Sequence, residues 1–152
     1  MLRYFYDNNL VAISEKTPKD WEEAIRESGE ILKQNGLITD QYVDQVINDV
    51  KEYGPYIVIV PGVAMPHSSA KNEGVLGTGI GFTLLPETVS FEEGNPEKDA
   101  QLFFMLAAKD SAAHMENIAN LSDLLMTEGL IDDLKKVKTM EDYVTVMEKY
   151  QL

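Results

Sequence analysis

The sequence predicts an α/β fold, a three-layer sandwich in which helices flank a mixed β-sheet on both faces. Two apolar runs, residues 56–60 and 101–108, are typical of buried strands because nearly every position in them is apolar. Stretches with helical periodicity both precede and follow these runs. Strands covered on both faces need helices on each side, so the sandwich is the expected arrangement. We expect the 152 residues to form one domain, residues 1–152.

Two helices are expected ahead of the first buried strand. Thr17 is the predicted N-cap of the first, because Pro18 follows at the position where a helix tolerates proline. Asn35-Gly36 is expected to end it. Thr39 is the predicted cap of the second helix, and Gly54-Pro55 is expected to stop that helix. The second helix carries an apolar stripe of Tyr42, Val43, Val46, Ile47 and Val50.

The middle of the chain is predicted to hold the strands. Residues 56–60 are expected to form a central strand, and residues 63–65 a short strand after it. Residues 75–85 form another predicted strand, whose glycines at 77, 79 and 81 allow the close approach of a backbone or a bulge. A short edge strand is expected at 89–91, and a second buried strand at 101–108.

Three further helices are predicted at residues 111–126, 128–136 and 139–150, from their apolar spacing. The methionines at these and nearby positions fall at spacings typical of core packing: Met105, Met115, Met126, Met140 and Met147. We expect no internal repeat and no low-complexity linker.

Composition excludes several classes of function. The formal net charge of -13 argues against binding to nucleic acid or to an anionic membrane, and favours a basic partner. No cysteine is present, which excludes disulfides and thiolate chemistry. The apolar runs are shorter than the roughly 18 residues that span a bilayer. With no signal peptide recognisable at the start, a cytoplasmic protein is expected.

His67 lies on a loop stiffened by proline at the end of a predicted strand. Pro66 fixes its own φ and favours an extended conformation at Met65. The following Ser68 and Ser69 leave room around the imidazole and offer polar groups that can cradle an anion. This placement suits a nucleophile, while a loop histidine hydrogen-bonded to backbone remains an open alternative.

His114 falls in the first turn of the helix predicted at 111–126, with Asp110 or Ser111 as N-cap. The positive end of a helix lowers the pKa of an imidazole and favours its neutral form. A neutral ring there can donate one N–H to an anion. A histidine at the edge of the core, bonded to a carbonyl, is the alternative.

Other chemistry lacks its sequence pattern. No His-x3-His pair or helical His-Glu-x-x-His occurs, so a metal site is not expected. The glycines at 77, 79 and 81 do not form a nucleotide-binding motif. No cofactor is therefore expected.

The segment Gly62-Val63-Ala64-Met65-Pro66-His67 resembles the enzyme IIA proteins of the bacterial phosphoenolpyruvate:sugar phosphotransferase system (PTS), in the mannitol–fructose superfamily (type 2). In that family a Gly-apolar-Ala-apolar-Pro-His segment carries a transiently phosphorylated histidine. The segments 21–24, 54–58 and 113–118 extend the resemblance to nearly the whole chain, closest to the L-ascorbate branch.

The resemblance implies a mannitol-type enzyme IIA fold and a phosphotransferase activity. His67 would be the phosphorylated nucleophile and His114 the group that stabilises the phosphoryl, with Ser68 and Ser69 as phosphate-binding residues. The donor would be the phosphocarrier protein HPr and the acceptor a cysteine of an enzyme IIB. A membrane enzyme IIC would then carry L-ascorbate or a related sugar acid, with no metal needed. Monomer and dimer both stay open.

Two positions depart from the family pattern. Family members often have an arginine two positions after the phosphorylated histidine, where this chain has Ser69. Mannitol-type relatives carry another arginine ahead of the motif, where Lys51-Glu52-Tyr53 has none. The alternatives to a transport role are a regulatory enzyme IIA-like protein and a small metal-dependent hydrolase that uses both histidines.

Overall fold

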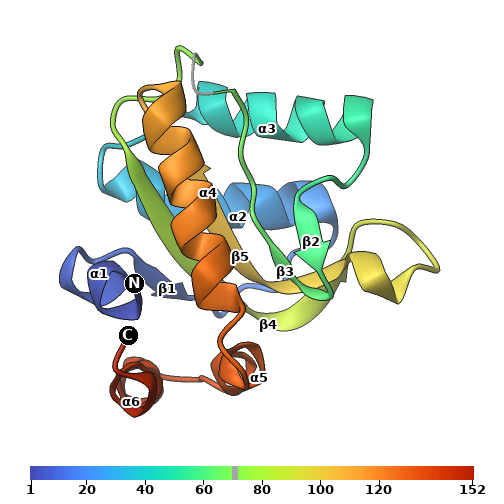
Figure 1. The fold of residues 1–152 in the computed structure, drawn as a ribbon. Helices are drawn as coiled ribbons and strands as arrows, with labels where there is room; N and C mark the ends of the chain where they lie inside the picture. Colours follow the sequence, from blue (N-terminus) through green and yellow to red (C-terminus); the bar gives the residue numbers. More distant parts are fainter. Residues whose placement is uncertain (70–71) are drawn as a thin grey trace.

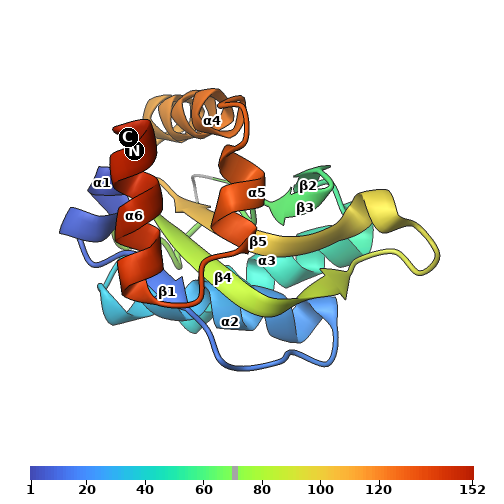
Figure 2. The ribbon, with the colours of Figure 1, turned by 90° about the horizontal axis from the view of Figure 1, so that it is seen from below.

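A computed structural model describes residues 1–69 and 72–152. Three layers are visible in Figures 1 and 2: the sheet lies between α2 and α3 on one face and α4, α5 and α6 on the other. The α/β sandwich predicted from the sequence is therefore confirmed. In chain order the elements are α1 (Leu2–Asp7), β1 (Val11–Ile13), α2 (Trp21–Gln34), α3 (Asp40–Tyr53), β2 (Val58–Val60), β3 (Gly62–Ala64), β4 (Gly79–Ser90), η1 (Pro96–Lys98), β5 (Asp99–Ala107), α4 (Ser111–Leu125), α5 (Leu130–Lys135) and α6 (Met140–Tyr150).

The described residues form a five-stranded mixed sheet in the order β1-β4-β5-β3-β2. β4 and β5 pair antiparallel over the longest stretch, whereas β1 is parallel to β4 and β3 is parallel to β5. The antiparallel β2–β3 pair lies at one edge. β5 is central and buried along nearly its whole length, as the apolar run at 101–108 predicted.

Aromatic side chains fill the layer between the sheet and the C-terminal helices. The rings of Phe82 on β4 and Phe104 on β5 stack with centroids 4.7 Å apart. Phe5 of α1 and Tyr143 of α6 pack against them, and all four side chains are fully buried. Rings of this size bury enough apolar surface to hold the two long central strands against the helices.

On the opposite face, the absence of a side chain at Gly81 lets α2 lie close to the sheet. A Cβ at this position would come within 2.6 Å of Ile31 Cγ2. Gly81 therefore makes room for side chains of α2, whereas the sequence predicted the close approach of a backbone or a bulge at the glycines of this strand.

The run at 56–60 is not a central strand, and that expectation was wrong. Only residues 58–60 form a strand, which lies at the sheet edge with Ile59 and Val60 exposed. The predicted strand 75–85 also begins later, at Gly79, and continues to Ser90 through a register shift, so residues 89–91 do not form a separate strand. Val75 makes only an isolated bridge to Ile38.

The first 13 residues contain two elements that periodicity did not predict, α1 and β1. Both are short, six and three residues long, so they hold too few positions for a periodic signal. Contacts far along the chain stabilise them instead. The Tyr143 hydroxyl donates to the Leu2 carbonyl (2.7 Å), and β1 pairs with the edge of β4.

Three of the five methionines expected in the core are exposed. Met105 and Met147 are buried as predicted, whereas Met115, Met126 and Met140 lie at the surface. The spacing predicted burial correctly only for methionines on the sheet or on a helix face that packs against it.

Among the helices described for residues 1–69 and 72–152, none is both long and apolar enough to cross a bilayer.

The N-cap predicted at Thr17 is wrong, because the N-cap of α2 lies three residues later. Asp20 caps it, and the carboxylate accepts the Glu23 N–H at 2.9 Å. Thr39 does occupy the N-cap position of α3, but its side chain makes no capping bond.

We expect Asp20→Ala to lower the free energy of unfolding by about 1 kcal/mol, because the Glu23 N–H loses its acceptor. Thr17→Ala is the matched control and should leave stability unchanged. Urea unfolding followed by circular dichroism measures both. A larger loss for Thr17→Ala than for Asp20→Ala would contradict this assignment.

Candidate active site

The loop that carries His67 follows β3 and is fixed by the backbone of Leu106 at the end of β5. The Leu106 N–H donates to the Pro66 carbonyl (3.0 Å), and the Leu106 carbonyl accepts the Tyr42 hydroxyl of α3 (2.5 Å). That hydroxyl oxygen accepts the Ser68 N–H (3.0 Å). Burial raises the pKa of Tyr42 to about 12, so the hydroxyl stays a donor at neutral pH. The loop is thus held on both sides of His67.

The His67 ring is held by its own loop in one tautomer. Its Nδ1 lies 2.6 Å from the Met65 carbonyl oxygen. Because a carbonyl only accepts, Nδ1 must carry the hydrogen of this bond, which leaves the lone pair of the neutral ring on Nε2. Burial lowers the pKa of His67, although the bond to Met65 and the charge of Asp49 act in the opposite direction. The site therefore favours a neutral imidazole with Nε2 as its basic nitrogen.

His114 stands beside it on the first turn of α4. Asp110 is the N-cap, as one of the two predicted options had it, and its side chain accepts the Ala113 N–H at 2.7 Å. The centroids of the two imidazole rings are 5.3 Å apart. Burial lowers the pKa of His114, and the neighbouring His67 lowers it further. The structure brings together the two histidines that the sequence singled out.

The two rings open into a pocket of about 350 Å³. Its lining residues are Asp49, Tyr53, Tyr56, His67, Ser68, Ser69 and His114. Tyr56 supports the loop from the other side: its hydroxyl donates to the His67 carbonyl at 2.6 Å, and its ring meets the imidazole edge-on. The pocket is large enough for a phosphoryl group and open to a partner.

The two serines of the loop differ in their surroundings. Ser68 is buried, and both of its donors are engaged, the N–H with Tyr42 and the hydroxyl with Asp49 (2.5 Å). A bond from Ser68 to a phosphate would require one of these bonds to break. Ser69 is exposed at the pocket, and its carbonyl accepts the Asn72 N–H (3.2 Å).

Sequence reasoning missed four residues of this site. Tyr42, Asp49 and Tyr53 lie seven and four residues apart on α3, which places them along one side of the helix. That spacing was a usable signal, but Tyr42 was interpreted only as part of an apolar stripe. Tyr56 was assigned to a strand. Among the described residues no group of three histidine, aspartate or glutamate side chains is arranged to hold a metal ion.

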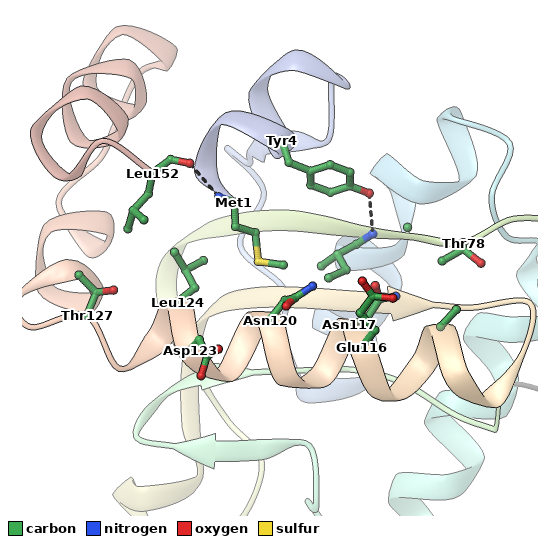
Figure 3. A pocket seen from close by; sticks show the side chains of 13 residues that line it. Met1, Tyr4, Thr78, Glu116, Asn117, Asn120, Asp123, Leu124, Thr127 and Leu152 are labelled. Carbon is green, nitrogen blue, oxygen red and sulfur yellow. Dashed lines mark hydrogen bonds between the residues drawn. The ribbon is translucent and has the colours of Figure 1, made fainter.

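A larger hollow, of about 690 Å³, lies beside α1 and the middle of α4, as Figure 3 shows. Tyr4 stands on one side of it, and its hydroxyl oxygen accepts the Ile80 N–H at 3.3 Å. Asn117 and Asn120 face it from α4. Neither histidine lines this hollow, so the chemistry of the imidazoles, not cavity size, identifies the candidate active site.

A comparison of the sequence with models of known protein families identifies the family of this chain. Residues 5–150 match the model of the family described as "Phosphoenolpyruvate-dependent sugar phosphotransferase system, EIIA 2". The chain belongs to this family. Its members are phosphotransferase components that carry phosphoryl groups, so this EIIA protein is a phosphoryl carrier of a sugar PTS.

Curated relatives of this EIIA protein differ in their sugar. The chain is 36% identical over 131 residues to the mannitol-specific cryptic phosphotransferase enzyme IIA component of Escherichia coli K12, covering 86% of each chain. It is 27% identical over 146 residues to the ascorbate-specific PTS system EIIA component of Salmonella typhimurium LT2, covering 94% of this chain and 92% of that one.

Solved structures share the fold. A candidate PTS IIA protein from Streptococcus mutans superposes with a TM-score of 0.83 at 28% identity, over 99% of this chain and 94% of that one. Enzyme IIA for mannitol from Escherichia coli, solved in complex with phosphorylated enzyme IIB, gives 0.75 at 26% identity, over 92% and 94%. The predicted mannitol-type fold is confirmed.

Few charged side chains lie around the histidine pocket among the described residues. None of the pocket's described lining residues is lysine or arginine. Lys51 of α3 pairs with Glu22 of α2 at 3.1 Å. Among the described lining residues, an anion in this pocket would meet imidazole and hydroxyl groups and no lysine or arginine side chain.

We expect His67→Gln to raise the pKa of His114, because the charge of a protonated His67 is one of the two causes that lower it. The rise should be partial, since burial is the larger cause and remains. Titration of the His114 ring signals by NMR between pH 4 and 9 measures it. An unchanged His114 pKa in this variant would show that the two rings do not interact.

Proposed function

We propose that His67 is the residue that carries the phosphoryl group, on Nε2, in a cytoplasmic carrier formed by residues 1–152 as one domain. The single observation that supports this most directly is the bond from Nδ1 to the Met65 carbonyl, which leaves Nε2 unprotonated in the neutral ring. The ring also lines an open pocket, where a partner protein can present a phosphoryl group.

The proposed transfer follows from this geometry. The Nε2 lone pair attacks the phosphorus of phospho-HPr and forms a new N–P bond. The bond between this phosphorus and HPr breaks, and its electron pair stays with HPr. In the second step a cysteine thiolate of an enzyme IIB attacks the same phosphorus, and the electron pair of the N–P bond returns to Nε2. Such transfers depend on positioning and charge stabilisation. The Nδ1–H bond is kept throughout, so the ring does not rotate.

His114 is proposed to stabilise the phosphoryl group. Its lowered pKa keeps it neutral before phosphorylation, and a neutral ring still offers one N–H to a phosphoryl oxygen. Approach of the phosphoryl's negative charge then favours its protonation. Ser69 is proposed as a second phosphate contact, and Ser68 as one that acts only if its bond to Asp49 or Tyr42 opens.

The partners and the sugar belong to the same proposal. HPr is the proposed donor, an enzyme IIB the acceptor, and a membrane enzyme IIC the indirect partner. The ascorbate-specific relative favours L-ascorbate or a related sugar acid, as does the lack of an arginine near Lys51. The higher identity to a mannitol-specific relative makes mannitol the second candidate. Phosphoryl transfer to ascorbate-type and mannitol-type enzyme IIB proteins distinguishes the two.

A regulatory role is the other candidate function for the same site. This role shares the phosphorylation step with transport, but no enzyme IIB accepts the phosphoryl group from the protein. The enzyme IIB panel therefore also separates transport from regulation, because a regulator would be phosphorylated and yet discharge to none of the panel.

We expect His67→Gln to abolish labelling by radioactive phosphoenolpyruvate with enzyme I and HPr, because the nucleophilic Nε2 is removed. His114→Gln is the matched control: it keeps the nucleophile and should still be labelled, although more slowly. Autoradiography after electrophoresis measures both. Undiminished labelling of His67→Gln would place the phosphoryl group on another residue.

A further inference from the structure

Asp49 is the only carboxylate among the described residues that line the histidine pocket. It lies on α3, one turn before Tyr53, and lines the same pocket as the two imidazoles. A carboxylate is an unexpected group at a site that must accept a phosphoryl group, because like charges repel. This side chain therefore needs an explanation of its own.

Its hydrogen bonds do not neutralise the charge. Oδ1 accepts from the Gln45 side-chain amide at 2.8 Å, and Oδ2 accepts from the Ser68 hydroxyl at 2.5 Å. Both donors are neutral. No ion pair among the described residues includes Asp49, whereas Asp44, five residues earlier on α3, is paired with Arg26 at 2.9 Å.

The charge of Asp49 also reaches the other groups of the pocket. Burial is the main cause that raises the pKa of Tyr56, and the field of Asp49 adds to it. The same field acts on Tyr42, and it opposes the lowering of the His67 pKa by burial. A second anion placed on His67 would be subject to that field.

We propose that Asp49 destabilises the phosphorylated form of His67 by electrostatic repulsion, and thereby makes the carrier a better donor to its acceptor. The inference rests on the proposed function, namely that His67 carries the phosphoryl group. In the unphosphorylated protein the carboxylate faces neutral rings at little cost. Attachment of a phosphoryl group brings negative charge into the same pocket, and discharge to the acceptor relieves the repulsion.

A purely structural role is the competing explanation, since Asp49 also holds Ser68 and through it the loop. Three substitutions separate charge from positioning. Asp49→Asn removes the charge but retains an oxygen that can accept the Ser68 hydroxyl. Ser68→Ala removes that bond but retains the charge. Asp49→Glu retains the charge on a longer side chain.

The measurement is the equilibrium constant for phosphoryl exchange between phospho-HPr and this protein, read as the fraction of each that is phosphorylated. We expect Asp49→Asn to raise the phosphorylated fraction so that the constant increases roughly three- to tenfold, the effect of one nearby charge in a partly solvated pocket. Asp49→Glu should stay near the wild-type constant, and Ser68→Ala should not raise the constant, because both variants retain a charged carboxylate in the pocket. Asp44→Asn, with the same charge change outside the pocket, is the matched control.

An unchanged constant in Asp49→Asn, in a variant whose circular dichroism matches the wild type, would overturn the inference. So would an equal increase in Ser68→Ala, which would show that the loop and not the charge is responsible. Neither result would affect the proposed function. That proposal fails separately, if the wild-type protein takes up no phosphoryl group from phospho-HPr.

Discussion

The histidine pocket depends on the backbone of Leu106, where the central strand β5 ends. One peptide N–H holds the Pro66 carbonyl, and the Leu106 carbonyl holds the Tyr42 hydroxyl that in turn binds Ser68. Because Leu106 is fully buried in the middle of the sheet, this anchor moves only if the core moves. The loop thereby places His67 with the precision of a strand while leaving its ring partly exposed to the pocket. Such support of a reactive group by a rigid element is what a phosphoryl carrier needs.

The loop itself determines the tautomer and the position of His67. The Met65 carbonyl selects the tautomer, and Tyr56 fixes the backbone on the far side of the ring. Burial lowers the pKa of both imidazoles and so favours their neutral forms, in which Nε2 of His67 keeps its lone pair and His114 can still gain a proton. Besides the two histidines and the two tyrosines, Asp49 is the one ionisable side chain among the described residues that line the pocket. The pocket is therefore poised to accept negative charge for a short time, which is consistent with a carrier whose task is to pass the group on.

The sequence was most informative where periodicity or backbone chemistry is local. The helices from α2 onward, the buried strand β5 and the stiff loop before His67 all follow from residues within a few positions of each other. The apolar run at 56–60 was misread because hydrophobicity alone does not distinguish a central strand from an edge strand next to a turn. Asp49 was not singled out, because its bond to Ser68, 19 residues away, and its place in the pocket appear only in the folded chain, and the sequence has 26 acidic residues.

In the proposed mechanism, the bond from His67 Nδ1 to the Met65 carbonyl directs the phosphoryl group to Nε2. The most direct test is NMR of the protein labelled with ¹⁵N in its histidines, after phosphorylation by phosphoenolpyruvate, enzyme I and HPr. Phosphorus–nitrogen coupling identifies which ring nitrogen is modified. The structure predicts coupling to Nε2 of His67, with Nδ1 still protonated. Coupling to Nδ1, or to either nitrogen of His114, would contradict it.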